Sequence, residues 1–271
     1  MPIIGLGQPI MGSLSWELST LFTRGAEKPA GLADVVFWRR SILRGRLMRS
    51  VPIVATLALL GAATPARADH DFQTWPVGIV QGKIKQDAIF WLEVQPRITD
   101  DAERLGQLLI RTAIGVQLSK RASIHSGYTF VRTDPIGRAL THEHRLWQQL
   151  LVPLSPPGKR LTITARTRLE ERFVEGYEGV GWRLRQQLRL QHPLGNRSKL
   201  SGVLWSEPFY SFNTTDWGQR SGWDQVRSFV GVSIPVTKQL TVEPGYLNQT
   251  VFRASGTRYN HIANVWVVLR L

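Results

Sequence analysis

Cysteine is absent from this 271-residue chain. Its absence excludes disulfide bonds, thiolate metal sites and cysteine nucleophiles. Long apolar runs are missing as well, because the apolar segment 51–63 is much shorter than the roughly 20 residues that a membrane-spanning helix needs. The sequence therefore predicts a fold that depends neither on a disulfide framework nor on a transmembrane helix.

Catalytic signatures are also lacking. No nucleophile-elbow or triad motif marks a serine. His142 and His144 lie two residues apart, which on a strand gives metal-ligand spacing on one face, but Glu143 faces the other way. His125 on the preceding strand is a candidate neighbour, and a pair of surface histidines near a rim is the alternative. We predict no catalytic residue, no metal and no cofactor.

Acidic residues are few: the chain has 20 Asp and Glu against 34 Lys and Arg, which gives a formal charge of +14. Such a basic chain would ordinarily suggest nucleic acid as a partner. Here the arginines stand singly at alternate positions of predicted strands instead of forming a surface patch, and residues 48–68, described next, predict export of the chain. We therefore expect no nucleic-acid partner.

Residues 48–68 have the organisation of a cleavable signal peptide. Arg49 supplies the positive charge, the apolar run 51–63 follows, and Ala66-Arg67-Ala68 fits the small-x-small cleavage rule. Cleavage after Ala68 would release a chain that begins at Asp69. Residues 1–47 show no sustained periodicity, and we interpret them as a non-native upstream extension or as a long n-region of the signal.

The segment 159–191 predicts how the rest of the chain is built. Between residues 161 and 172, mainly apolar side chains alternate with Thr, Arg and Glu, and between 182 and 191 Trp and Leu alternate with Arg and Gln. A period of two sorts each segment into an apolar face and a charged face, which is typical of strands and not of helices.

The length of these segments points to a membrane barrel. Each runs past the 5–6 residues that are usual for globular strands and reaches the roughly 9–11 residues of a transmembrane β-strand. Alternating lipid-facing apolar and lumen-facing polar residues are typical of outer-membrane barrels, which must close because lipid leaves no partner for an open edge. The many tryptophans suit either an interfacial girdle or lumen packing. We predict an all-β, antiparallel, up-and-down transmembrane barrel.

Counting strands from the carboxyl end gives ten, over residues 88–271, with twelve as the alternative if one segment is split. An additional strand at 72–80 would make eleven and would place the two chain ends on opposite sides. We therefore predict that 69–87 is a periplasmic or lumenal lead-in. The connections near 119, 156, 195 and 236 look shorter than those near 101, 136, 176, 216 and 255, as expected for periplasmic turns and external loops.

The charged face of the strands predicts a ladder of residues in the lumen. Its members are Glu93, Arg97, Arg111, Glu143, Arg145, Arg166, Arg168, Glu170, Arg172, Arg183, Arg185, Arg189, Glu207, Arg227 and Glu243. Side chains largely fill barrels of this size, so one interpretation is a structural lumen closed by salt bridges. The other is a narrow anion-permeable pore, because ten arginines outnumber five glutamates.

These patterns predict an outer-membrane protein of the bacterial cell. The expected partners are outer-membrane lipid, the barrel-assembly machinery and a small anionic solute. Two alternatives remain open, namely an outer-membrane enzyme that modifies lipid or peptide, by analogy with barrel enzymes, and a soluble periplasmic β-barrel binding protein.

Four separated motifs support a family resemblance. They are Asp71-Phe72-Gln73-x-Trp75, Glu143-His144-Arg145-x-Trp147-Gln148, Arg166-x-Arg168-Leu169-Glu170-x-Arg172 and Gly245-Tyr246-Leu247-Asn248-Gln249. Through them the chain resembles the bacterial family called domain of unknown function 2490, over about residues 69–271. The resemblance implies an exported outer-membrane β protein and implies no reaction.

Overall fold

The computed structural model describes residues 69–119 and 122–271, and they contain eleven β-strands. The strands are β1 (Asp69–Lys85), β2 (Ala88–Thr99), β3 (Arg104–Gln117), β4 (Ser123–Thr133), β5 (Thr141–Pro153), β6 (Thr162–Val174), β7 (Gly181–Pro193), β8 (Ser201–Ser211), β9 (Gly222–Pro235), β10 (Leu240–Arg253) and β11 (Gly256–Arg270). No helix in this part of the chain is long and apolar enough to cross a membrane. The signal peptide and upstream segment assigned to residues 1–68 lie outside the described residues.

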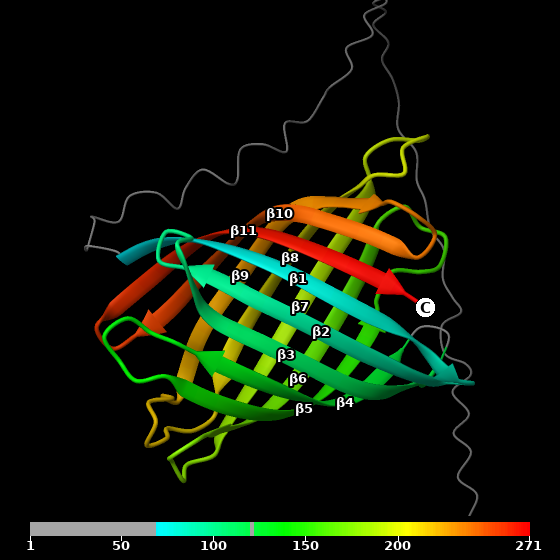
Figure 1. Ribbon diagram of the computed structural model, residues 1–271. Helices are drawn as coiled ribbons and strands as arrows, with labels where there is room; N and C mark the ends of the chain where they lie inside the picture. The colour runs from blue at the N-terminus through cyan, green and yellow to red at the C-terminus, as the bar shows by residue number, and fades with distance from the viewer. Residues whose placement is uncertain (1–68, 120–121) are drawn as a thin grey trace, which may run out of the picture. The chain divides into compact units, whose positions relative to one another are not determined.

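All eleven strands belong to one closed barrel, in which each strand pairs with its neighbours in sequence and β1 pairs with β11 (Figure 1). The all-β barrel expected from the sequence is therefore confirmed. Closure leaves no free sheet edge, so the backbone groups of the wall can bond within the wall itself.

One pair departs from the antiparallel pattern. Strand β1 runs parallel to β11, in a register that extends from Asp69 opposite Arg258 to Gln81 opposite Arg270. Every hairpin reverses the chain direction, so an odd number of strands brings the first and the last together in the same direction. The parallel pair is a geometric consequence of the eleventh strand.

The lead-in expected at 69–87 is wrong, because this segment supplies β1 of the barrel wall, and the count becomes eleven, between the expected ten and twelve. Its period of two is present, with Gln73, Trp75, Val77 and Ile79 buried along one face. Polar residues and Pro76 hide this pattern in the sequence. Pro76 is tolerated although it has no N–H to donate to the ladder.

The two ends of the barrel are named here by the chain ends that they carry. The amino rim holds the start of β1 and the connections 100–103, 134–140, 175–180, 212–221 and 254–255. The carboxyl rim holds the end of β11 and the connections 86–87, 118–122, 154–161, 194–200 and 236–239. Lengths at the two rims overlap, so the expected alternation of short turns and long loops is absent and does not orient the barrel.

The two faces of the wall have an inverted polarity compared with a water-soluble domain. Among the described residues, 27 polar or charged residues are buried against 14 hydrophobic ones, and 33 large hydrophobic residues are exposed. The buried residues face the lumen at alternate positions, for example Glu93, Gln95 and Arg97 on β2. The polar face is therefore the inside of the barrel.

Candidate functional site

The fifteen charged residues of the predicted ladder all lie along the lumen. Twelve of them are buried, and the side chains of Arg166, Arg172 and Arg189 are partly accessible from the ends of the barrel. The alternation of the strands places them there, because residues i and i+2 of one strand share a face.

The centre of the lumen is built around Glu170 on β6. Arg183 lies directly opposite it on β7 and donates from Nε and Nη2, at 3.1 and 2.6 Å, to Oε2 of Glu170. Arg185 donates from Nη1 to the other carboxylate oxygen at 2.7 Å. Glu170 is 1% exposed, so its carboxylate is out of reach of bulk water. Both of its oxygens accept charge-assisted hydrogen bonds from arginine instead.

Arg185 extends this centre to a second carboxylate. Its Nε donates to Oε1 of Glu207 on β8 at 2.9 Å, and Arg166 on β6 donates to the same oxygen at 2.8 Å. We call these five residues, Arg166, Glu170, Arg183, Arg185 and Glu207, the central network.

Further ion pairs lie on either side of the central network. Toward the amino rim, Glu143 on β5 accepts bidentate hydrogen bonds from Arg145, at 2.7 and 2.8 Å, and from Arg172, at 2.6 and 3.2 Å. Glu93 and Arg111 lie opposite each other on β2 and β3 and form a buried ion pair. Toward the carboxyl rim, Arg189 bonds both oxygens of Glu243 at 2.8 and 2.9 Å.

Aromatic rings support the guanidinium groups between these pairs. The Arg97 Cζ atom lies 3.8 Å from the centroid of Trp75, and the Arg168 Cζ atom lies 4.0 Å from that of Trp147. Phe209 lies under Arg185 at 4.4 Å. A cation over a ring face is attracted by the ring quadrupole, and more strongly when it is desolvated. The sequence leaves its tryptophans open between an interfacial girdle and lumen packing, although the strand phase of these rings matches that of the ladder.

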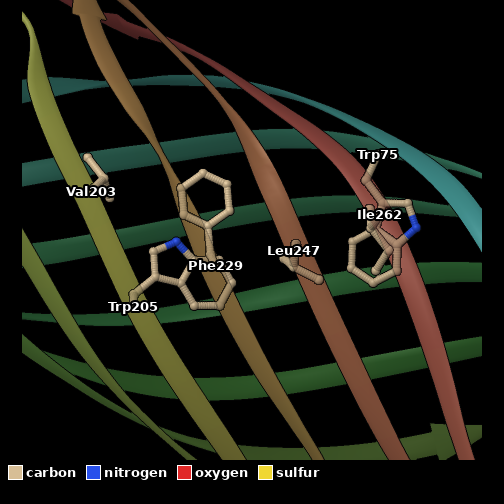
Figure 2. Close-up of a cluster of buried hydrophobic side chains, with 6 residues drawn as sticks. All are labelled: Trp75, Val203, Trp205, Phe229, Leu247 and Ile262. Carbon is tan, nitrogen blue, oxygen red and sulfur yellow. The ribbon is translucent and has the colours of Figure 1, made fainter. Parts of the chain in front are cut away.

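Apolar side chains line the part of the lumen formed by β8 to β11 and β1. Figure 2 shows this cluster, which consists of Trp75, Val203, Trp205, Phe229, Leu247 and Ile262. Trp205 and Phe229 stack with their centroids 5.3 Å apart. Gly231 and Gly245 lie beneath the Phe229 ring, and a Cβ at Gly245 would collide with that ring and with the Val230 carbonyl oxygen.

The network and the aromatic cluster close the middle of the barrel. A cavity of about 800 Å³ opens at the amino rim, and two cavities of about 370 and 530 Å³ lie toward the carboxyl rim. Between them, beside Glu207 and Trp205, lies a cavity of about 30 Å³. That volume is enough for a water molecule or two. The lumen is thus two vestibules separated by a packed layer of side chains.

We call the vestibule at the amino rim the amino vestibule. Its lining is rich in arginine, and its acidic residues are all aspartates. Its charged lining consists of Arg97, Arg104, Arg138, Arg145, Arg172, Arg183, Arg227, Arg253, Arg258, Asp71, Asp100, Asp134 and Asp224. The four aspartates form ion pairs, Asp71 with Arg258, Asp100 and Asp134 with Arg104, and Asp224 with Arg183. The excess of cations favours anions inside this vestibule.

The histidines do not form a metal site with His125. His142 and His144 face outward, and each bonds one oxygen of Glu175, at 3.0 and 2.9 Å. His125 is buried on the lumen side of β4, so the suggested proximity of His125 to this pair is wrong. No group of three metal-ligating side chains occurs within residues 69–119 and 122–271. The alternation of β4 could have shown this, because its odd-numbered residues, His125 among them, face the lumen, whereas His142 and His144 face outward on β5.

The outer surface differs between the two halves of the barrel. Exposed aromatic residues lie from mid-strand to the amino rim, and they are Phe72, Tyr128, Phe173, Tyr177, Trp182, Tyr210, Phe212, Trp223, Tyr246 and Phe252. The large hydrophobic residues that are exposed in the carboxyl half are aliphatic, such as Ile114, Leu188 and Val267. Tryptophan and tyrosine prefer the boundary between apolar and aqueous phases, which distinguishes the amino rim from the other end.

Comparison with known proteins places this architecture in a family. The model of the family described as "Protein of unknown function (DUF2490)" matches residues 72–260. An uncharacterised protein of Methylorubrum extorquens is 34% identical over 226 residues, which cover 83% of this chain and 96% of that protein. No solved structure gives a significant match. The chain therefore belongs to the DUF2490 family, as its four motifs suggested.

Proposed function

We propose that this protein is an outer-membrane β-barrel whose lumen is sealed at its middle and takes up small anions from one end. The observation that carries the proposal is the inverted polarity of the wall, with charged residues buried inside and large apolar residues exposed outside. A water-soluble barrel would gain nothing from exposing such a surface, whereas a hydrocarbon surrounding would cover it.

The dimensions of the wall support this proposal. Each strand has between 11 and 17 residues, which meets the roughly 9–11 residues that a tilted strand needs to cross a bilayer. The barrel is closed, so no unpaired edge would meet lipid. The aromatic residues near the amino rim fit one interface of a membrane.

The lumen supports an anion-binding role in preference to an open pore. Glu170 and Glu207 are fully buried, and each is held by at least two arginines from β6 and β7. Removing one partner of a buried ion pair is expensive, so the packed layer resists opening. A conducting state would require Arg166 and Arg185 to leave their carboxylates.

Membrane fractionation tests the location. We expect the mature chain to appear in outer-membrane fractions, to require detergent for extraction, and to migrate faster on gels before boiling than after. A mature chain that remains dissolved and monomeric without detergent would favour a periplasmic binding protein and would overturn the membrane assignment.

Planar-bilayer recording tests whether the packed layer of side chains blocks ion flow through the lumen. We expect the wild-type protein to remain silent, and Arg185→Ala to conduct with a preference for anions, because this change removes the cation shared by Glu170 and Glu207. Arg220→Ala, at an exposed loop residue of the amino rim, provides the matched control and should remain silent. Steady anion-selective currents through the wild-type protein would refute the sealed lumen and favour the pore.

A further inference from the structure

Two buried arginines of the amino vestibule form no ion pair, although Glu207 on β8 lies opposite one of them, Arg227, on β9. Arg97 and Arg227 are 7% and 9% exposed, and neither forms an ion pair with a described residue. Their hydrogen bonds go to neutral amides. Arg97 donates to Gln107 at 2.7 Å and to Gln95 at 3.2 Å, whereas Arg227 donates from Nε to Gln225 at 3.3 Å.

The remaining donors of these two arginines have no acceptor among the described residues. The Nε atom of Arg97 is buried without a hydrogen-bond partner. Arg227 uses only its Nε in the contact with Gln225, which leaves Nη1 and Nη2 available. Unpaired cations in a desolvated site are costly, and such a site gains free energy when an anion enters it.

Both arginines lie next to the same aromatic ring. The Cζ atom of Arg97 is 3.8 Å from the centroid of Trp75, and that of Arg227 is 5.2 Å from it. Because both distances share one centroid, the two Cζ atoms are no more than about 9 Å apart. This upper limit leaves room for both guanidinium groups to bond one oxyanion, since N–H···O bonds of about 2.7–2.9 Å place two such Cζ atoms at most roughly 8 Å apart.

We infer that Arg97 and Arg227 form a binding site for a compact oxyanion, a phosphate or carboxylate group carried by a small molecule. Both residues line the cavity of about 800 Å³ that opens at the amino rim, so the anionic group would bind beside Trp75 and the rest of the ligand would extend toward the rim. A cavity of this volume is typical of small-molecule sites.

Neutral amides complete the site. Gln225 contacts Arg227 and also accepts a hydrogen bond from Gln249, which in turn accepts one from Asn260 at 2.9 Å. These side chains position Arg227, and Glu207 opposite it accepts its hydrogen bonds from Arg166 and Arg185. The Nη1 and Nη2 donors of Arg227 therefore stay available to a ligand. The carboxylates of the vestibule are already engaged with other arginines, as described above. This inference deepens the proposed function by naming the group that is recognised.

Calorimetric titration of the detergent-solubilised protein tests the site. Inorganic phosphate and acetate are the probes, and chloride at equal ionic strength is the reference. We expect saturable binding of at least one oxyanion, and affinity that is roughly tenfold or more weaker in Arg97→Gln and in Arg227→Gln, because each change removes one charge-assisted contact. Arg220→Gln, at an exposed arginine of the same rim, should stay within about twofold of wild type.

Thermal unfolding gives a second readout that a merely structural arginine would not reproduce. In anion-free buffer Arg97→Gln should be at least as stable as wild type, because it removes a buried unpaired cation, and it should lose the stabilisation that the bound anion confers. Absence of saturable oxyanion binding, unchanged binding in both variants, or a clear loss of stability in Arg97→Gln without anion would overturn the site. Binding in detergent is independent of fractionation, so the two proposals fail separately.

Discussion

The lumen has two walls of opposite character. The ionic wall, centred on β5 to β7, carries Glu143, Glu170 and their arginines, whereas the apolar wall of β8 to β11 and β1 carries the stacked aromatic cluster together with Glu207, Arg227 and Glu243. Each wall fills its half of the lumen in a different way. The ionic wall depends on complete pairing, and the apolar wall depends on shape.

This difference shows how side chains alone can block the lumen of a barrel of this size, without a separate plug domain. Charged side chains reach far across the lumen, as Arg183 does from β7 to Asp224 on β9 at 2.8 Å. Flat rings pack close to the wall, as Phe229 does over Gly231 and Gly245. Substitutions in the two walls should therefore fail for different physical reasons.

The largest expected effect is at the centre of the ionic wall. Glu170→Ala leaves Arg183 and Arg185 without their shared carboxylate in a desolvated place, which should lower the free energy of unfolding by about 3–5 kcal/mol. Equilibrium unfolding of the detergent-folded protein by urea measures it. Glu171→Ala, at the next residue on the outer face, is the control and should change little; equal stability of the two variants would contradict the ionic wall.

A smaller effect is expected in the apolar wall. Gly245→Ala places a Cβ against the Phe229 ring, and overpacking of this kind should cost about 1–3 kcal/mol. The same unfolding assay measures it. Gly78→Ala is the matched control, because a Cβ there would meet only the Val94 carbonyl oxygen, at 4.0 Å. A stability loss in the control as large as that in Gly245→Ala would show that strand glycines matter for backbone reasons alone.

The smallest effect belongs to the hydrogen bonds of Glu175 with His142 and His144 outside the lumen, where water screens charges. Hydrogen bonds from His144 and His142 hold the pKa of Glu175 below its usual range. A carboxyl pKa depressed by folding contributes stability above its unfolded value, and this contribution is lost as the pH falls through the folded value.

Unfolding midpoints measured from neutral to acidic pH test this point. We expect Glu175→Gln to be slightly less stable than wild type near neutral pH and equal to it in acid. Glu171→Gln should show no such convergence. A loss of stability in Glu175→Gln as large as that in Glu170→Ala would contradict the expected difference between ion pairs in the lumen and polar contacts on the exterior.

Much of the candidate site is readable from the chain because a strand has a period of two. That period places Arg183, Arg185 and Glu170 on the inner face before any pairing is known. It does not say which carboxylate each arginine meets. Arg166 on β6 reaches Glu207 on β8, 41 residues away, and this contact depends on the curvature of the closed wall.

The sequence by itself determined the all-β class, the inward face of the charged strands after β1 and the charge of the lumen, because these follow from local alternation. Tertiary structure decided what depends on closure. It placed β1 between β2 and β11, which set the count at eleven and made one pair parallel. It also left Arg97 and Arg227 beside Trp75 without an ion pair, because pairing inside a lumen is fixed only once the wall has closed into a ring.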